Sequence, residues 1–127
     1  MPGPEELLRL DLPADPAYVG VVRAVVTSVA GSIEGLSDDR LDDLRLAVSE
    51  ACTSAVISGG VDRILVRCVH DPAALEVSIE DVGPTRASDR LAGEDFARQL
   101  LTALVDDLVI DEAEGGNVVR LRLTLDA

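Results

Sequence analysis

Alternating hydrophobic and polar residues mark several short segments of the chain, a pattern typical of strands with one buried face. Near the N-terminus Leu8, Leu10 and Leu12 alternate with polar residues. Five segments are predicted as strands: residues 8–12, 63–70, 75–81, 109–112 and 118–125. The turn-forming sequence Asp71-Pro-Ala-Ala joins the second and third strands, and Gly115-Gly116-Asn117 joins the last two. Each of these pairs is therefore expected to form a β-hairpin.

Longer segments carry their hydrophobic residues at helical spacing. The first segment follows Asp15-Pro16, a helix cap with a first-turn proline. Its repeat is formed by Val19, Val22, Val26, Val29 and Ile33. Although β-branched residues favour strands, thirteen or more residues without a turn are long for a strand, so a helix is predicted. A second helix is predicted over residues 37–58, and a third carries Phe96, Leu100, Leu101, Leu104 and Leu108.

The helix at 37–58 has two hydrophobic stripes. One is strongly apolar and runs through Leu41, Leu44, Val48, Ala51, Cys52 and Ala55. The opposite one is semi-apolar and runs through Leu46, Glu50, Thr53, Ser54 and Ile57. This pattern predicts a helix that is covered on both sides.

Together these elements predict an α+β fold. Clean alternation in three strands indicates a mostly antiparallel mixed sheet with one wet face, and the helices then pack on the other face as a two-layer sandwich. No repeat or long linker divides the chain, so residues 1–127 are expected to form a single domain.

Composition narrows the classes of function. The 127 residues include 24 acidic and 11 basic side chains, for a net charge of −13, and Tyr18 and Phe96 are the only aromatic residues. Such a chain repels phosphate backbones, so we expect no direct nucleic-acid binding and consider a basic protein partner plausible. No membrane span or secretory signal is visible, and Cys52 and Cys68 fit buried thiols of a cytoplasmic protein. With His70 as the only histidine, no metal cluster is predicted.

Three segments together resemble one family. They are Leu46-Ala-Val-Ser-Glu-Ala-Cys-Thr-Ser-Ala-Val on a helix, Ser78-Ile-Glu-Asp-Val-Gly-Pro at a strand end, and the stretch from Leu100 to Leu121. The chain resembles the bacterial anti-sigma factors and serine-protein kinases with the histidine-kinase-like (GHKL, Bergerat) ATPase fold. The resemblance covers nearly the whole chain in the right element order.

The resemblance implies roles for the first two segments. In the family a helical Glu is the general base, and an Asn four residues later holds Mg²⁺ against ATP. Here Glu50 matches, Ser54 stands in the place of Asn, and Ser58 stands where His is common. A serine hydroxyl is a shorter and weaker ligand than an amide carbonyl. Asp81 and Gly83 match the family's adenine-binding motif Asp-x-Gly-x-Gly, but Pro84 and Thr85 follow, so the second glycine is missing.

The remaining motifs are more altered. The family's glycine-rich lid corresponds to Gly93-Glu-Asp-Phe-Ala-Arg, which also contains Ala97. In this stretch the carboxylates of Glu94 and Asp95 stand where phosphates would approach. A carboxylate about 4 Å from a phosphate opposes binding by about 4 kcal/mol at an effective dielectric constant near 20. Gly116-Asn117 stands where the family has Gly-Thr. ATP and Mg²⁺ are therefore expected to bind weakly or not at all.

Two functions follow. The first is an anti-sigma-factor-like regulator that sequesters a sigma factor, with an anti-anti-sigma factor as a second partner and a homodimer as its assembly. The alternative is an active Mg-ATP-dependent serine kinase that phosphorylates an anti-anti-sigma factor, with Glu50 as base. A third interpretation keeps only the fold and a dimer interface.

Some of the singled-out residues also have simpler interpretations. Glu50 could be a solvated helix residue, and Asp81 with Gly83 a plain turn. The acidic run from Asp106 to Glu114 is either solvated surface or a contact for a basic partner.

Overall fold

The computed structural model describes residues 3–57, 61–83, 94–113 and 116–126. Along the chain its elements are β1 (Glu5–Pro13), the short 3-10 helix η1 (Pro16–Tyr18), α1 (Val19–Ala30), α2 (Asp38–Ile57), β2 (Arg63–His70), β3 (Ala74–Val82), α3 (Glu94–Leu104), β4 (Asp107–Ala113) and β5 (Gly116–Thr124). The predicted strands and helices are thus confirmed, with bounds that differ by a few residues.

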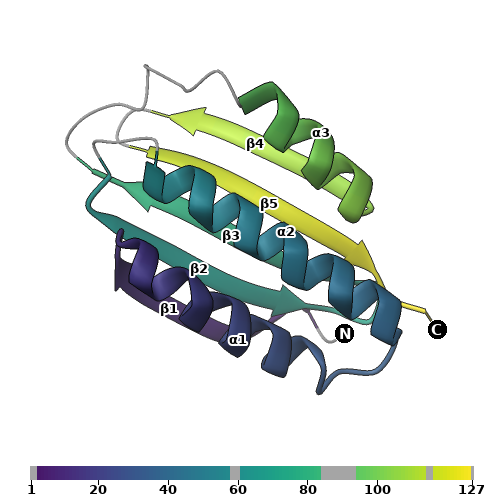
Figure 1. Cartoon of the computed structure of the whole chain (residues 1–127). Helices are drawn as coiled ribbons and strands as arrows, with labels where there is room; N and C mark the ends of the chain where they lie inside the picture. Colours follow the sequence, from purple (N-terminus) through teal and green to yellow (C-terminus); the bar gives the residue numbers. More distant parts are fainter. Residues whose placement is uncertain (1–2, 58–60, 84–93, 114–115, 127) are drawn as a thin grey trace.

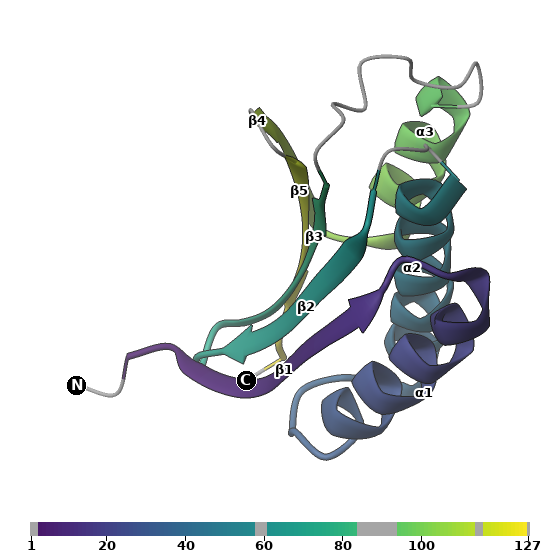
Figure 2. The ribbon, with the colours of Figure 1, turned by 90° about the vertical axis from the view of Figure 1, so that its left-hand side faces the viewer.

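The five strands form one sheet in the order β1-β2-β3-β5-β4, and all four neighbouring pairs are antiparallel. The three α-helices lie side by side on one face of this sheet, with α2 between α1 and α3 (Figure 1). Turned by 90°, the molecule shows a curved sheet and a separate helical layer (Figure 2). The predicted two-layer α+β fold is confirmed.

Short polar side chains start the first two helical segments. The carboxylate of Asp15 accepts a hydrogen bond from the backbone N–H of Ala17 at 2.9 Å, which confirms the predicted cap. The hydroxyl of Ser37 accepts one from the N–H of Arg40 at 3.2 Å, just before α2 begins. The valine-rich α1 is helical because its apolar stripe is buried against the rest of the core, which outweighs the β-branched preference for strands.

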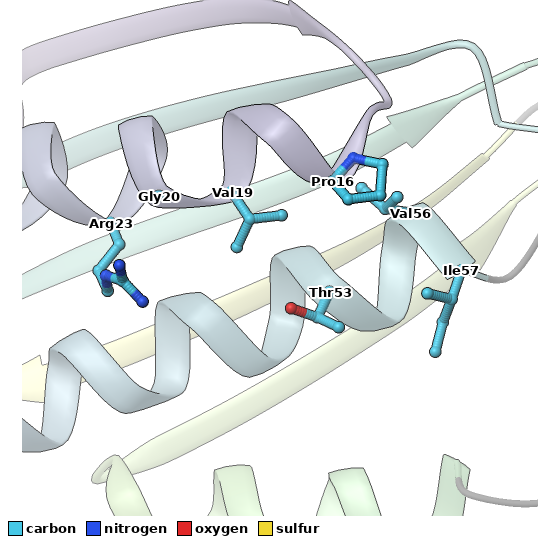
Figure 3. A pocket seen from close by; sticks show the side chains of 7 residues that line it. All are labelled: Pro16, Val19, Gly20, Arg23, Thr53, Val56 and Ile57. Carbon is cyan, nitrogen blue, oxygen red and sulfur yellow. The ribbon is translucent and has the colours of Figure 1, made fainter.

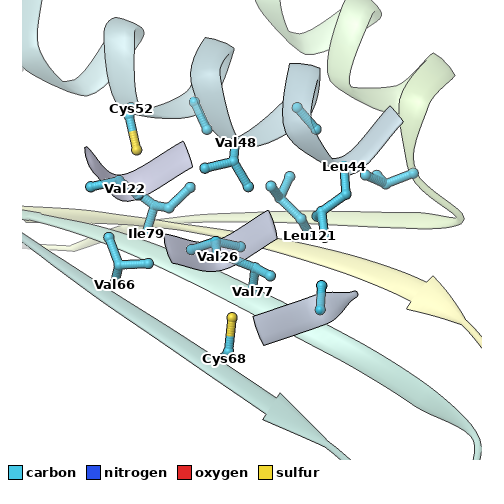
Figure 4. Packing of buried hydrophobic residues seen from close by; sticks show 14 of the residues in the cluster. Val22, Val26, Leu44, Val48, Cys52, Val66, Cys68, Val77, Ile79 and Leu121 are labelled. Atoms are coloured by element: carbon cyan, nitrogen blue, oxygen red, sulfur yellow. The ribbon is translucent and has the colours of Figure 1, made fainter. Parts of the chain in front are cut away.

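The core lies between the helical layer and the sheet (Figure 4). Helix α1 contributes Val22 and Val26, and α2 contributes Leu44, Val48 and Cys52. The sheet meets them with residues of β2, β3 and β5: Ile64, Val66, Cys68, Leu75, Val77, Ile79, Leu121 and Leu123. These are the alternate positions of each strand, so the sequence pattern correctly identified the buried face.

The opposite face of the sheet is covered by ion pairs. Arg9, Arg67, Ser78, Arg120 and Val109 lie in register across the five strands. Its arginines pair with carboxylates of the same face, as in Arg9–Glu6, Arg63–Asp11, Arg67–Glu6, Arg120–Asp111 and Arg122–Glu76. Five of the nine arginines that the structure describes lie on this face, where their ion pairs offset its carboxylates.

Three predictions need correction. The side chains of Leu46 and Ile57 are 57% and 55% exposed, so the second stripe of α2 is open and not covered. Leu108 belongs to β4, because α3 already ends at Leu104. Gly116 and Asn117 are the first residues of β5 and not part of a turn, whereas Gly115 lies outside the described residues.

One glycine has a position that no other residue fits. Gly35 has a φ of +102°, and its carbonyl accepts from the N–H of Asp126 at 3.0 Å. A Cβ at Gly35 would lie 2.9 Å from the carbonyl oxygen of Asp126, so the C-terminal segment can reach the α1–α2 connection only because this residue is glycine.

None of the helices in the described part of the chain is both long and apolar enough to span a membrane.

Candidate functional site

The residues singled out by the sequence gather at one end of the molecule. The C-terminal ends of α2 and β3 and the N-terminal ends of α3 and β5 all lie there in both views (Figures 1 and 2). These four ends carry Glu50 and Ser54, Asp81 and Gly83, Asp95 and Ala97, and Gly116 and Asn117. Residues from four separate stretches of sequence are therefore brought to one edge of the two-layer fold.

Asp81 is the best-defined residue of this group. Its side chain is buried at the end of β3, with 7% exposure, and Oδ1 accepts a hydrogen bond from the backbone N–H of Asn117 at 2.6 Å. Asn117 is 8% exposed and begins the neighbouring strand β5 with Gly116. A buried carboxylate is costly unless donors satisfy it, so this contact orients Asp81 and fixes the start of β5.

Glu50 and Ser54 share one face of α2, because residues four apart in a helix lie one above the other. Both side chains are half-buried, in contrast to Thr53 and Ile57 on the exposed side of the helix. The interpretation of Glu50 as a freely solvated residue is therefore too simple. A carboxylate next to a hydroxyl provides a base and a neutral donor or acceptor, but no strong cation ligand besides Glu50.

For the remaining candidate residues the structure gives the backbone position or the burial of the residue. Gly83 follows β3 directly and is half-buried, while Ala97 is buried in the first turns of α3. Asp95 belongs to the first turn of α3, and its side chain lies outside the described part of the structure. Gly116 contributes only backbone, as the first residue of β5. Ser58, Pro84 and Gly93 are outside the described residues altogether.

Neither the two cysteines nor the single histidine is used in this candidate site. Burial raises the pKa of the Cys52 and Cys68 thiols to about 12, as expected for core residues with no reactive role. His70 lies 3.7 Å from a carboxylate oxygen of Glu5 at the edge of the sheet. Among the residues that the structure describes, no three His, Cys, Asp or Glu side chains are grouped to hold a metal ion.

Some carboxylates of the acidic run after α3 form contacts within the molecule. Asp106 pairs with Arg40 at 2.5 Å and accepts from the N–H of Thr124 at 2.7 Å. Asp111 pairs with Arg120 on the open face of the sheet. These two carboxylates are exposed but already have partners, whereas Asp107 has no ion pair within the described residues.

Sequence reasoning missed Arg23. This residue lines a hollow of about 330 Å³ between α1 and α2, together with Val19, Thr53, Val56 and Ile57 (Figure 3). In the sequence Arg23 only interrupts an apolar segment, and nothing shows which neighbour it faces. The one available signal is that Arg23 and Thr53 are polar residues on the two helices that the core pattern predicts to be neighbours.

Comparison with known proteins identifies the family. The sequence profile of the histidine kinase-like ATPase domain matches residues 12–123, which is nearly the entire chain. This chain belongs to the histidine kinase-like ATPase domain family. The resemblance found in the sequence is thereby confirmed.

Named relatives of this histidine kinase-like domain are RsbW proteins. The serine-protein kinase RsbW of Bacillus subtilis is 30% identical over 133 residues, covering 89% of this chain and 82% of the relative. The anti-sigma-F factor RsbW of Mycobacterium tuberculosis is 36% identical over 101 residues, covering 80% and 59%. A solved structure of the RsbU and RsbW domains of a Mycobacterium tuberculosis protein has a TM-score of 0.73, with 24% identity, over 98% of this chain and 33% of that one. That likeness shows the fold.

The histidine kinase-like site here fits a nucleotide unevenly. Asp81 is buried and pre-oriented by Asn117, which suits a carboxylate that accepts from an adenine amino group. The metal side fits less well, because Ser54 offers a hydroxyl where the family resemblance implies an amide carbonyl. The described residues thus place a buried, oriented carboxylate on one side of the site, and only a hydroxyl where the family resemblance implies a metal-binding amide.

Proposed function

We propose that this chain is an anti-sigma-factor-like regulator of transcription. It sequesters a sigma factor or a related partner through its surface, and an anti-anti-sigma factor releases that partner. Support comes from the RsbW relatives, which are named as an anti-sigma factor and as serine-protein kinases. The chain spans 82% of the Bacillus subtilis relative, so most of such a protein is represented here.

The observation that carries the proposal is the combination of Glu50 with Ser54 on one face of α2. The base position of the family is kept, and the metal position has lost its amide. Asp95, in the first turn of α3, adds negative charge to a segment that would approach phosphate in the family. Weak or absent ATP and Mg²⁺ binding follows, and it leaves partner capture as the main activity.

The charge of the helical layer supports a basic partner. Helix α2 alone contains five acidic residues and two arginines. On the open face of the sheet, the ion pairs balance positive and negative charge. An approaching basic protein is therefore attracted mainly to the helical side. The same field disfavours nucleic acid, and we propose no direct contact with DNA or RNA.

A second candidate function is an active serine/threonine kinase. It is favoured by the oriented carboxylate of Asp81, which suits adenine, and by the half-buried Glu50 as general base. In this alternative Ser54 and a bound water would replace the missing amide at Mg²⁺.

Thermal unfolding with Mg-ATP separates the two functions. A ligand present at a hundredfold excess over its Kd stabilises the native state by about 2.7 kcal/mol. For a domain of this size that corresponds to a rise in Tm of roughly 10 °C. If the chain is a regulator with a weak nucleotide site, its Tm is expected to rise by less than 1 °C at 1 mM Mg-ATP. A large shift, together with phosphate transfer to an anti-anti-sigma factor, would establish the kinase instead.

Binding to a sigma factor tests the regulator itself. The chain is mixed with each purified sigma factor of its source cell, and binding is followed by calorimetry at two salt concentrations. One sigma factor is expected to bind in the submicromolar range, and more weakly at high salt, because the proposed contact is electrostatic. If none binds with or without Mg-ATP, the proposal is wrong.

The remaining expectations belong to the same proposal. We place the protein in the cytoplasm, as a homodimer of single-domain chains covering residues 1–127. The two buried, free cysteines are consistent with a reducing compartment.

A further inference from the structure

Helix α2 carries a line of side chains that the core does not use. At alternating steps of four and three residues, six positions share one face of this helix. This outer stripe consists of Asp39, Asp43, Leu46, Glu50, Thr53 and Ile57. None of the six residues is buried, whereas the opposite face of α2 is packed into the core. Because α2 is the middle one of the three α-helices, the outer stripe runs along the middle of the helical layer (Figure 1).

Two large aliphatic side chains of the outer stripe are exposed to water. Leu46 is 57% and Ile57 is 55% exposed, and neither belongs to the hydrophobic core or to the residues packed against it. They lie eleven residues apart, which corresponds to about three turns or 16 Å of helix. A single element that covers both side chains would remove them from water together, and this favours its binding.

The spacing of the outer stripe is that of a helix–helix contact. Steps of four and three residues keep side chains aligned with a second α-helix, as in coiled coils and in amphipathic helices that bind to another protein. The stripe extends from Asp39 to Ile57, over about 27 Å of helix. A partner helix of about five turns could therefore contact it over its whole length.

Carboxylates without ion pairs indicate the charge of such a helix. Two of the five acidic residues of α2 pair with its two arginines, in the contacts Asp42–Arg45 and Asp43–Arg40. Asp39 and Glu50 on the outer stripe form no ion pair within the described residues. A second copy of the chain is a poor occupant, because each copy has a net charge of −13 and brings the same carboxylates to the contact. A helix with lysine or arginine beside its aliphatic residues is complementary in both respects.

We propose that the outer stripe of α2 docks an amphipathic, basic α-helix of the protein partner. Aliphatic side chains of that helix cover Leu46 and Ile57, and its lysines or arginines lie beside Asp39 and Glu50. The apolar contacts hold the partner helix, and the charges select and orient it. The proposal rests on the proposed function for the existence of a protein partner, and it adds where that partner is held and by which kind of element.

The first experiment needs no identified partner. The probe is a peptide of three Lys-Leu-Ala-Ala-Leu-Lys-Ala heptads, which is titrated into the 15N-labelled full chain. A scrambled peptide of the same composition, whose leucines do not align on one helical face, controls for unspecific attraction to an acidic protein. We expect saturable amide shifts on α2, centred on residues 46–57, with the heptad peptide only. If no saturable shift appears on α2, or if the scrambled peptide binds equally well, the proposal is wrong.

Substitutions test the location of this binding. Leu46→Gln and Ile57→Gln are each expected to raise the Kd of the heptad peptide at least fivefold. Val109→Gln, at a 41% exposed position on the open face of the sheet, is the matched control and should stay within twofold. Asp39→Asn should raise the Kd two- to threefold, whereas Asp107→Asn, at another exposed carboxylate without an ion pair in the described part of the chain, should not. Equal effects of test and control variants would overturn the proposal.

The second experiment uses the sigma factor or anti-anti-sigma factor that binds the chain. Leu46→Gln and Ile57→Gln are each expected to weaken this binding at least tenfold, and Val109→Gln is expected to change it less than twofold. The heptad peptide should compete with the partner for the chain. Equal losses for the three variants, or no competition, would contradict docking on the outer stripe. Circular dichroism confirms that each variant is folded.

The two experiments fail in different ways. If no sigma factor or anti-anti-sigma factor binds, the proposed function is wrong, and the peptide titration still decides whether the outer stripe binds a basic helix. If Leu46→Gln makes the free chain sediment as a smaller species, a second copy covers the outer stripe and the docking proposal is wrong.

Discussion

The backbone N–H of Asn117 donates to Oδ1 of Asp81 at 2.6 Å, and both residues are buried. This bond ties the start of β5 to the end of β3, where the two strands leave their regular ladder. The pairing of Glu80 with Val118 is the last one of that ladder. The side chain of Asp81 therefore takes over as acceptor where backbone pairing ends.

Replacing Asp81 tests this contact. Asp81→Ala leaves the buried N–H of Asn117 without its acceptor, which costs about 1–3 kcal/mol of unfolding free energy. Glu80→Ala, at the exposed neighbouring position, is expected to change stability by less than about 0.5 kcal/mol. Urea denaturation measures both. The amide of Asn117 should also exchange faster in Asp81→Ala, and equal stability of the two variants would show that the bond carries no net energy.

A second prediction concerns Asp106, which accepts from two donors. It pairs with Arg40 of α2 at 2.5 Å and with the N–H of Thr124 at 2.7 Å. Arg40→Ala removes only a partly exposed ion pair, worth about 0–1 kcal/mol. Asp106→Ala also removes the exposed hydrogen bond to the N–H of Thr124, worth about 0.5–1.5 kcal/mol, so a larger loss than in Arg40→Ala is expected. Thermal unfolding at low and high salt separates the two contributions, since salt weakens mainly the ion pair.

A third prediction follows from the buried thiols. Burial raises the pKa of Cys52 and Cys68 to about 12 in the folded chain, while an unfolded cysteine ionises near its ordinary value of about 9. The unfolded state alone therefore gains thiolate as the pH rises above 9. The free energy of unfolding should fall by about 1 kcal/mol per pH unit and thiol between pH 9 and 12.

Cys68→Ala provides the control for this effect. It is expected to lower stability at pH 7 because it leaves a small cavity, but to reduce the slope above pH 9. Urea titrations at pH 7, 9 and 10 give that slope. An unchanged slope in Cys68→Ala would mean that other groups cause the alkaline loss. In native protein at pH 8 both thiols should also react with iodoacetamide much more slowly than in urea.

A fourth prediction addresses the nucleotide site. Ser54→Asn restores an amide, and Asp95→Gly with Ala97→Gly removes a charge and gives the start of α3 backbone freedom. The triple variant should lose about 1–2 kcal/mol of basal stability, because glycine replaces two helical residues. It should nevertheless gain more stabilisation from 1 mM Mg-ATP than the unchanged chain does.

The matched control keeps both glycines and carries Ser54→Ala. It has nearly the same basal stability but no metal-binding amide, so it should gain less from Mg-ATP than the Asn variant. The readout is the rise in Tm caused by the ligand, so differences in basal stability cancel. No difference between the two variants would mean that Ser54 is not the weak point of the site.

Much of the fold could be predicted from local sequence. The alternation in residues 75–81 identified the buried positions Leu75, Val77 and Ile79, because successive side chains of a strand point to opposite faces of the sheet. The cap at Asp15 was visible because a helix N-terminus needs acceptors from nearby residues, whereas the cap at Ser37 was found only in the structure. The exposure of the second stripe of α2 was not predictable, because the sequence around Leu46 and Ile57 does not show whether another element covers these side chains.

The sequence by itself determined which strand residues face the core and which residues match family motifs, namely Glu50, Asp81 and Gly83. These depend on local periodicity and spacing, which a single chain displays directly. Only the tertiary structure decided that Asn117 donates to Asp81 and that Arg23 lines a hollow together with Thr53 and Val56. Such contacts join residues 30 or more positions apart. Their partners are chosen by the strand order β1-β2-β3-β5-β4 and by the packing of α1 against α2, which local patterns do not specify.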